Sequence, residues 1–171
     1  CTAPTNEKDY SVFVNPFIGT GGHGHTFPGA VVPHGMIQPS PDTRIDGWDA
    51  CSGYYYEDST INGFSHTHVS GTGCCDYGDV LLMPTVGEQR YQTTDPQSQQ
   101  LAYSSAFSHE NETAEPGYYS VFLDTYQVKA EISATKRSAI HRYTFPESSE
   151  AGFILDLDYS LQRQTNSDMG I

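Results

Sequence analysis

The 171-residue chain has no run of about 18 apolar residues, so no segment of it is expected to span a membrane as a helix. It has only eight Lys and Arg residues against 21 Asp and Glu, which gives a net charge of −13. This balance argues against nucleic-acid binding, because phosphate recognition needs clustered Lys and Arg. The chain also lacks a convincing amphipathic helical pattern and any internal repeat.

Residues typical of β-structure and loops are plentiful, with 16 Gly, 12 Tyr and 8 Phe. The second half is rich in β-branched and aromatic residues and divides into strand-length segments at 101–109, 117–126, 127–137, 138–145 and 151–159. The first half alternates short apolar runs with Gly, Pro, Asp and Ser. We therefore predict an all-β fold, an antiparallel β-sandwich with long irregular loops at one edge. It covers residues 11–171, after a flexible polar tether at 1–10.

Three segments carry more specific predictions. In QVKAEISATKR (127–137), apolar and polar residues alternate from Val128 to Thr135, which is typical of a strand with one solvated face. FILDL (153–157) is apolar enough for a central strand. SHENETAEPGYY (108–119) is expected to be a polar loop.

The four cysteines are Cys1, Cys51, Cys74 and Cys75. Cys1, followed by the polar TAPTNEKD, resembles the mature start of a bacterial lipoprotein, with a lipid on Cys1 and a location in the periplasm or at the outer membrane or cell surface. The alternative is a chain boundary that happens to fall on a cysteine. If Cys1 carries lipid, at least one of the other three cannot pair within the chain. Cys51 with Cys74 or Cys75 is then the favoured bridge, if any forms.

Residues 15–35, NPFIGTGGHGHTFPGAVVPHG, contain six glycines and three histidines. Two further stretches, 44–58 and 63–79, also combine Gly with His, Asp, Ser or aromatic residues. This composition is typical of the polar lining of a site. Loops held by a rigid sheet are where binding sites commonly lie.

Two pairs of histidines have the spacing His-x-His. His66 and His68 would point to one face of a strand, and His23 and His25 repeat the spacing in a glycine loop. Zinc sites use this spacing, but no Asp or Glu stands at a familiar offset for a third ligand. Two other interpretations stay open: hydrogen bonds that shape the loops, and imidazoles that bind sugar hydroxyls or a neighbouring protein surface.

Trp48 is the only tryptophan, and it lies in a Gly-Trp-Asp turn between Asp46 and Asp49. This setting favours a surface or pocket edge. An indole beside carboxylates suits a pyranose, whose C–H groups pack on the ring while its hydroxyls donate to the acids. A structural use of Trp48 is the alternative. No pair of acids is singled out for glycoside hydrolysis, and no Gly-x-Ser-x-Gly motif occurs.

Several collinear motifs within residues 13–160 together resemble the N-terminal part of glycoside hydrolase family 92. They are NPFIGTGGHGHTFPGAVVPHGMIQPSPDT, CSGYYYEDSTINGFSHTHVSGTG, DYGDVLLMP, FSHENETAEPGYYSVFLD and HRYTFP. The resemblance implies an inverting, calcium-dependent exo-α-mannosidase, in which a β-sandwich precedes a larger (α/α)6 domain and the pocket lies between the two.

In that family the general acid, the general base and most calcium ligands come from the (α/α)6 domain, which lies outside this sequence. The resemblance therefore implies no catalytic residue and no metal ligand in this chain, and an inactive isolated chain. The implied partners are a mannose-containing glycan, as in N-glycan degradation, and the chain's own C-terminal domain.

The resemblance also implies that Trp48 meets sugar. Residues expected to line the pocket or the domain junction are Gly21, Gly22, His23, Asp49, Cys51, His66 and His68. Many members carry a second Trp where this chain has Ala50, which puts the α-1,2 linkage preference in doubt. Two competing hypotheses are a free-standing carbohydrate-binding lipoprotein module and a small zinc hydrolase built on the His-x-His pairs.

Overall fold

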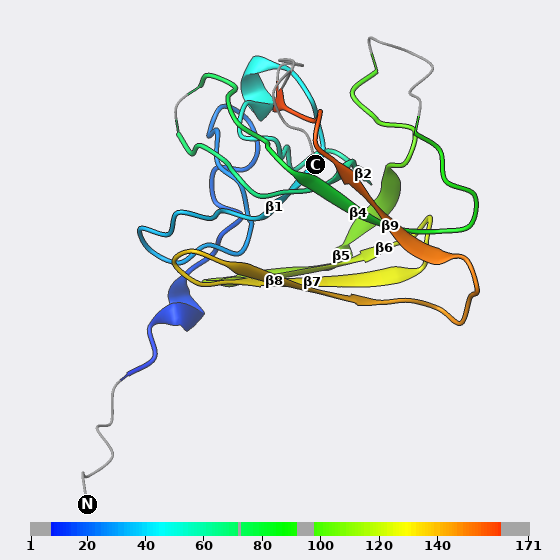
Figure 1. Cartoon of the computed structure of the whole chain (residues 1–171). Coiled ribbons are helices and arrows are strands. Elements are labelled where there is room, and N and C mark those ends of the chain that lie inside the picture. The colour runs from blue at the N-terminus through cyan, green and yellow to red at the C-terminus, as the bar shows by residue number, and fades with distance from the viewer. Residues whose placement is uncertain (1–7, 72, 92–97, 162–171) are drawn as a thin grey trace, which may run out of the picture.

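A computed structural model shows the fold and describes residues 8–71, 73–91 and 98–161 (Figure 1). In chain order the elements are η1 (Ser11–Phe13), β1 (Ser40–Asp42), η2 (Trp48–Ala50), β2 (Thr60–Ile61), β3 (Gly63–Ser65), β4 (Leu81–Val86), β5 (Ser105–Glu115), β6 (Tyr118–Leu123), β7 (Val128–Ala134), β8 (Ala139–Thr144) and β9 (Ala151–Asp156). Both η elements are single 3-10 turns. Within the described residues no helix is long and apolar enough to cross a membrane.

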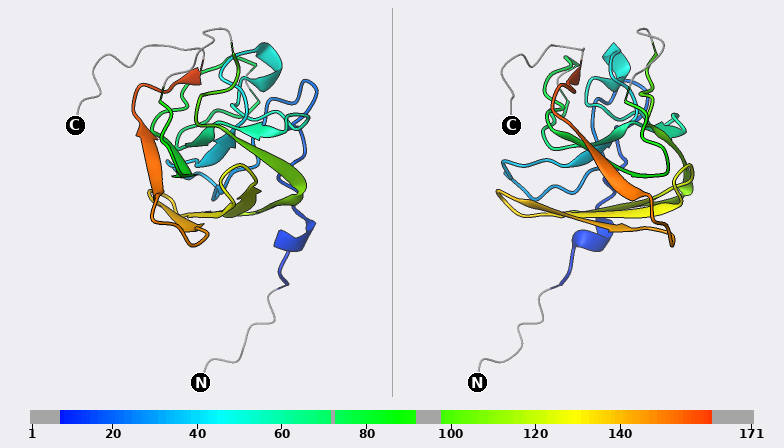
Figure 2. Two further views of the ribbon diagram at one scale, coloured as in Figure 1. Left: turned by 90° about the vertical axis from the view of Figure 1, so that its right-hand side faces the viewer. Right: turned by 45° about the vertical axis from the view of Figure 1, so that its right-hand side comes forward.

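The strands form two antiparallel sheets. One has the order β1-β3-β4-β9 and the other the order β2-β5-β6-β7-β8. The first sheet lies over the second, and the core fills the space between them (Figures 1 and 2). The predicted all-β, antiparallel sandwich is confirmed.

Alternating burial along the strands builds this core. In β7, Val128, Ala130 and Ile132 are buried while Lys129 on the opposite face is exposed, as the pattern of residues 127–137 predicts. A valine or isoleucine side chain contributes about 1.5–3 kcal/mol when it is fully buried. Regular burial of this kind gives the rigid support on which the irregular first half rests.

The prediction of a polar loop at residues 108–119 is wrong. β5 runs through this segment to Glu115, and a turn at Gly117 (φ +76°) leads into β6. The register of β5 against β6 shifts between Phe107 and Glu112. The strand therefore contains an irregularity of the β-bulge type, which the sequence pattern does not predict. The acidic residues fit a strand because Glu112 points inward to hydrogen-bond donors.

The prediction of a central strand at FILDL is also wrong. β9 ends the order of its sheet and has β4 as its one strand neighbour within the described residues. Ile154 faces the core, but Phe153 and Leu155 are 64% and 46% exposed. The apolar run therefore belongs to a strand with apolar side chains on both faces. In this structure only the face with Ile154 packs against the core.

The long connections of the first half gather on one side of the sandwich, at the left and top of Figure 1. They are the segments 14–39, 43–59 and 66–80, and both views in Figure 2 keep them together. The predicted edge of irregular loops is thus confirmed. Residues 1–7, which hold most of the expected tether and Cys1, lie outside the described residues.

Candidate functional site

Trp48 lies at the start of the single turn η2, at the point where loops from three parts of the chain meet. Gly47 precedes it with φ +118°, a backbone conformation that favours glycine. The turn packs inward through Ala50, which is 1% exposed, and leaves the indole of Trp48 59% exposed. Ala50 therefore belongs to the packing beneath η2 and is not part of the exposed surface beside the indole.

The indole contacts the two other loops. The ring of His25 meets it edge-on, with centroids 4.4 Å apart, and the ring of His23 lies 5.1 Å away. On the third loop, a Cβ atom added to Gly73 would lie 3.2 Å from the indole Nε1. The residues around Trp48 therefore come from segments that lie about 25 positions before it and about 25 positions after it in the sequence.

A polar rim adjoins the exposed indole. His23 Nδ1 hydrogen-bonds to Asp49 Oδ1, and the His23 side chain is 73% exposed. An open aromatic face with a carboxylate and an imidazole beside it can pack against sugar C–H groups and hydrogen-bond to sugar hydroxyls. We call Trp48, His23, His25 and Asp49 the Trp48 cluster.

Hydrogen bonds to backbone carbonyl groups hold the loops of the cluster in place. The Ser52 hydroxyl lies 2.6 Å from the carbonyl oxygen of His25 and 2.9 Å from that of Val69, so it joins all three segments. Gly71 N–H also donates to the His25 carbonyl, at 2.6 Å. A Cβ at Gly24 would lie 2.2 Å from a backbone oxygen, so only glycine fits there.

His25 is a member of the cluster that sequence reasoning did not select. It is 6% exposed, it has φ +55°, and its Nε2 has no hydrogen-bond partner among the residues that the structure describes. The His-x-His spacing with His23 was the available signal, but the spacing could not tell which ring is buried beneath the indole.

His68 is fully buried and holds β1 against the loop that follows β3. Its Nδ1 donates to the carbonyl of Gln38 at 2.7 Å, and its Nε2 lies 2.8 Å from Asp42 Oδ1 and 3.0 Å from Ser65 Oγ. Asp42 and Ser65 meet the same nitrogen, whereas a catalytic triad places them on opposite nitrogens. The arrangement is therefore a structural carboxylate–imidazole pair and not a nucleophile with its base.

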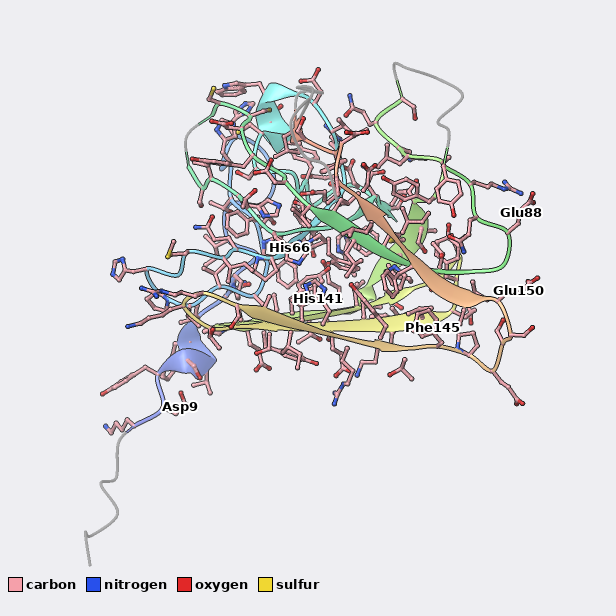
Figure 3. The ribbon with its side chains drawn as sticks, in the orientation of Figure 1. Asp9, His66, Glu88, His141, Phe145 and Glu150 are labelled. Carbon is pink, nitrogen blue, oxygen red and sulfur yellow. The ribbon has the colours of Figure 1, made fainter. Side chains whose placement is uncertain are left out.

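His66 faces the five-stranded sheet. Its Nδ1 donates to the Val80 carbonyl at 2.6 Å, its Nε2 lies 3.1 Å from Nε2 of His141 on β8, and Tyr143 contacts His141 Nδ1 at 2.9 Å. Figure 3 shows the two rings between the layers. Burial lowers the pKa of His66, and burial together with His66 lowers the pKa of His141 to about 4. Both rings are neutral at pH 7.

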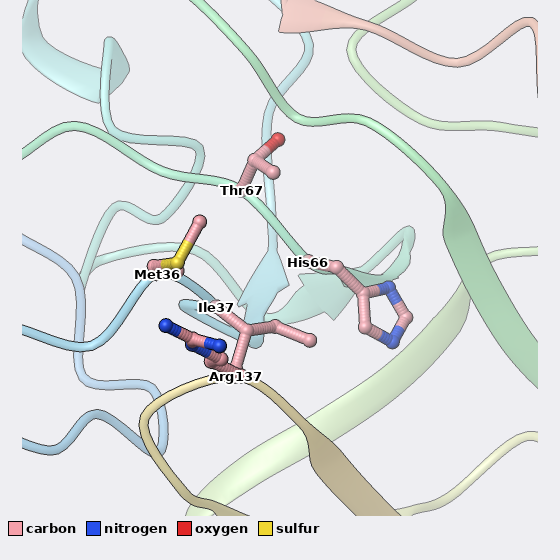
Figure 4. A pocket seen from close by; sticks show the side chains of 5 residues that line it. All are labelled: Met36, Ile37, His66, Thr67 and Arg137. Carbon is pink, nitrogen blue, oxygen red and sulfur yellow. The ribbon is translucent and has the colours of Figure 1, made fainter.

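A hollow of about 660 Å³ adjoins His66 (Figure 4). Its other lining residues are Met36, Ile37, Thr67 and Arg137. No member of the Trp48 cluster lines it. His66 and His68 therefore do not join Trp48 at one surface, and their rings turn to different partners.

A third group of polar side chains lies between the loops and the five-stranded sheet. The buried carboxylate of Glu112 on β5 accepts hydrogen bonds from the hydroxyls of Tyr54 and Tyr119, at 3.0 Å and 2.5 Å, and from His109 Nδ1 at 2.6 Å. The His109 ring also stacks on Tyr56 at 4.2 Å. Burial, followed by the charge of Glu112, raises the pKa values of both tyrosines that contact the carboxylate.

A family model described as the glycosyl hydrolase family 92 N-terminal domain matches residues 13–171. The chain belongs to this family. The resemblance noted in the sequence is thereby confirmed.

Solved structures agree with the assignment. A family GH92 α-mannosidase from Bacteroides thetaiotaomicron, in complex with mannoimidazole, has a TM-score of 0.83 and 45% identity over 88% of this chain and 20% of its own. The family GH92 inverting mannosidase from Bacteroides thetaiotaomicron VPI-5482 has a TM-score of 0.73 and 33% identity over 90% of this chain and 20% of its own.

A protein of Arthroderma benhamiae described as an uncharacterized secreted glycosidase is 31% identical over 147 residues, which are 84% of this chain and 18% of that protein. The chain therefore spans about a fifth of the length of the proteins that it matches.

In this family 92 domain, the carboxylates near the loops have partners within the domain. Asp42 pairs with His68, Asp49 with His23, and Asp58 with Arg44 through a bidentate contact at 2.8–3.1 Å. Glu112 is enclosed by its three donors. Asp42, Asp58 and Glu112 therefore have structural roles, whereas Asp49 lies at the exposed rim of the Trp48 cluster.

The remaining predicted site residues are glycines and a cysteine. Gly21 and Gly22 precede His23, and a Cβ at Gly21 would lie 3.1 Å from the Glu57 carboxylate, whereas Gly22 has open space around it. Cys51 is a free thiol, 1% exposed, at the C-terminal end of η2, and burial raises its pKa. Cys51 thus supports η2 from the core, and the bridge considered for it does not form in this structure.

Proposed function

We propose that the chain is the N-terminal β-sandwich of an inverting, calcium-dependent exo-α-mannosidase and that the Trp48 cluster forms one wall of its substrate pocket. The observation that carries the proposal is the exposed indole with the His23–Asp49 pair beside it. The family match and the mannoimidazole complex of a solved relative support a mannoside as the ligand.

The roles divide between this domain and polypeptide outside it. Inversion needs a general acid and a general base about 6.5–9.5 Å apart, with water between them. The carboxylates near the Trp48 cluster have structural partners here, and the chain spans about a fifth of its relatives. We therefore assign both catalytic groups to the rest of the full-length enzyme. Trp48 holds the sugar ring, and His23 with Asp49 orients its hydroxyls.

Calcium takes six to eight oxygen ligands. No group of three or more His, Cys, Asp and Glu side chains that could hold a metal ion occurs in the described part of this chain. The described residues therefore supply no carboxylate cluster for a calcium site, and we assign the ion mainly to the C-terminal domain. The same observation gives no support to a zinc hydrolase built on the His-x-His pairs.

The substrate we propose is a terminal α-mannose of a mannose-containing glycan, as in N-glycan degradation, with an α-1,2 linkage as the first candidate. The linkage depends on the sugar beyond the scissile bond. Initial rates of the full-length enzyme on α-1,2-, α-1,3- and α-1,6-mannobiose would compare these substrates directly. A faster rate on the α-1,2 disaccharide is the expected result.

For location, we propose export and a lipid on Cys1, with the enzyme in the periplasm or at the outer membrane or cell surface. The fungal relative is described as secreted. Membrane fractionation of the wild type and of Cys1→Ser tests the proposal, since only the wild type is expected in the membrane fraction.

The purified 171-residue chain tests the division of roles. We expect no release of product from an aryl α-mannoside, and only very weak binding of mannose by titration calorimetry. Saturable binding of mannose by the chain alone would instead favour a free-standing carbohydrate-binding module. Turnover by the chain alone, insensitive to a chelator, would contradict the proposal outright.

A further inference from the structure

The free edge of β9 differs from the other three sheet edges. β1 has three residues with a proline at its centre, and β2 has two residues. β8 carries Arg142 and follows Lys136 and Arg137 in the chain. Soluble proteins protect their edges with short strands, prolines and charges of this kind, because an open edge pairs with other chains.

β9 has none of these protections along most of its length. Its sequence AGFILD contains no Lys, Arg or Pro, and its one charge stands at the last residue, Asp156. Phe153 and Leu155 project from it at 64% and 46% exposure, on the face opposite the buried Ile154. Among the residues that the structure describes, the edge is therefore six residues long, apolar and without a strand on the side away from β4.

A groove of about 590 Å³ adjoins the C-terminal part of β9. It is lined by residues 153–158 together with Tyr91 and Tyr103. The Tyr103 hydroxyl donates to Asp156 Oδ2 at 2.5 Å, so the wall of the groove is fixed to the strand itself. A groove that follows consecutive residues of an edge strand, with aromatic rings beside it, has the shape that an added extended segment occupies.

We propose that a β-strand from the rest of the full-length polypeptide adds to β9 and covers Phe153 and Leu155. This inference rests on the proposed function, in which the sandwich is part of a longer enzyme. The relatives are about five times as long as the part matched, so abundant polypeptide exists to fill the groove. A second copy of the chain is a poorer occupant, because each copy has a net charge of −13.

Hydrogen exchange of the full-length enzyme tests the proposal with an internal control. Alternate amides of β9 point toward β4 and away from it. We expect the amides on both sides to be protected at least 100-fold relative to a free peptide. Fast exchange of the outward set beside a protected inward set would overturn the proposal. Protection that disappears when the enzyme is diluted to a monomer would assign the edge to a second copy and would also overturn it.

Substitutions in the full-length enzyme provide a second readout. Phe153→Lys is expected to speed exchange of the outward amides of β9 at least tenfold, whereas Ile140→Lys, at an apolar position of β8 that is 70% exposed, is expected to leave them unchanged. Equal rates in both variants would contradict strand addition. The proposed function has a separate readout, the effect of Trp48→Ala on kcat/KM, so each can fail without the other.

Discussion

Gly53 is the residue on which the buried His68–Asp42 pair depends most directly. It has φ +85°, and a Cβ added there would lie 2.0 Å from Asp42 Oδ1 and 3.3 Å from His68 Nε2. Any larger side chain must push the carboxylate away from the imidazole. Breaking a buried pair of this kind costs about 3–5 kcal/mol, because a polar group is left buried without its partner.

Gly53→Ala is therefore expected to lower the free energy of unfolding by about 3 kcal/mol or more, measured by urea denaturation. Gly71→Ala is the matched control. It also has a positive φ, +76°, but open space around it, so it carries only the backbone cost of about 1–2 kcal/mol. Equal losses in the two variants would show that the pair does not hold the loops.

His141 makes stability depend on pH. An unfolded histidine has a pKa of about 6.5, whereas burial, aided by His66, lowers the pKa of folded His141 to about 4. Well above pH 6.5, the His141 ring is neutral in both the folded and the unfolded state. The free energy of unfolding then loses nothing to protonation of this ring. As the pH falls toward 4, only the unfolded state takes up the proton, so stability declines by up to about 1.4 kcal/mol per pH unit.

Urea denaturation between pH 7 and pH 4 checks this slope. His141→Phe, which keeps a ring but cannot titrate, is expected to have a shallower slope than the wild type. NMR gives the direct value, since the His141 ring signal should shift near pH 4. A midpoint near 6.5 would contradict a buried neutral ring.

Single residues also show how far the sequence could be interpreted. The exposure of Trp48 is predictable because a lone indole between acids is unusual in an apolar core. The roles of His25, His66 and His68 were not separable, since identical His-x-His spacing places one ring under the indole, one against His141 and one against Asp42. Partners distant in sequence decided these roles, and local spacing contains no information on them.

Among the elements, β5 and β6 depend on one buried carboxylate. Glu112 gathers the hydroxyls of Tyr54 and Tyr119 and the ring of His109, which links both strands to the loop before β2. Glu112→Gln replaces an acceptor-only group by an amide that also donates. We expect a loss of about 3 kcal/mol in the free energy of unfolding, measured by thermal or urea unfolding.

Glu115→Gln lies on the same strand and is exposed, so it serves as the control with an expected change within about 0.5 kcal/mol. A Glu112→Gln variant as stable as this control would mean that the three donors find equivalent partners without the charge.

The elements of the second half were predictable because alternation and β-branched residues act locally. The bounds of β6, β7 and β8 fall within the segments 117–126, 127–137 and 138–145. The acidic residues of β5 are typical of a solvated loop, and only the inward donors to Glu112, which are distant in sequence, place this segment in a strand. The edge position of β9 depends on the order of strands in the sheet, which a single strand's composition does not determine.

For the molecule as a whole, two sheets hold three long loops on one side, and those loops bring the Trp48 cluster together. Composition and spacing predicted the sandwich and its loop-rich edge. Collinear motifs indicated the family. The separation of the His66 hollow from the Trp48 cluster could not be predicted, because it depends on how β8 approaches the loop after β3.

The kinetics of Trp48→Ala in the full-length enzyme test the central claim most directly. Loss of an aromatic surface that stacks on sugar should reduce kcat/KM for an α-mannoside at least tenfold. Phe13→Ala, at an aromatic position that is 82% exposed on η1, on the side of the sandwich away from η2, should leave it unchanged (Figures 1 and 2). Wild-type kcat/KM in Trp48→Ala would remove the Trp48 cluster from the substrate pocket.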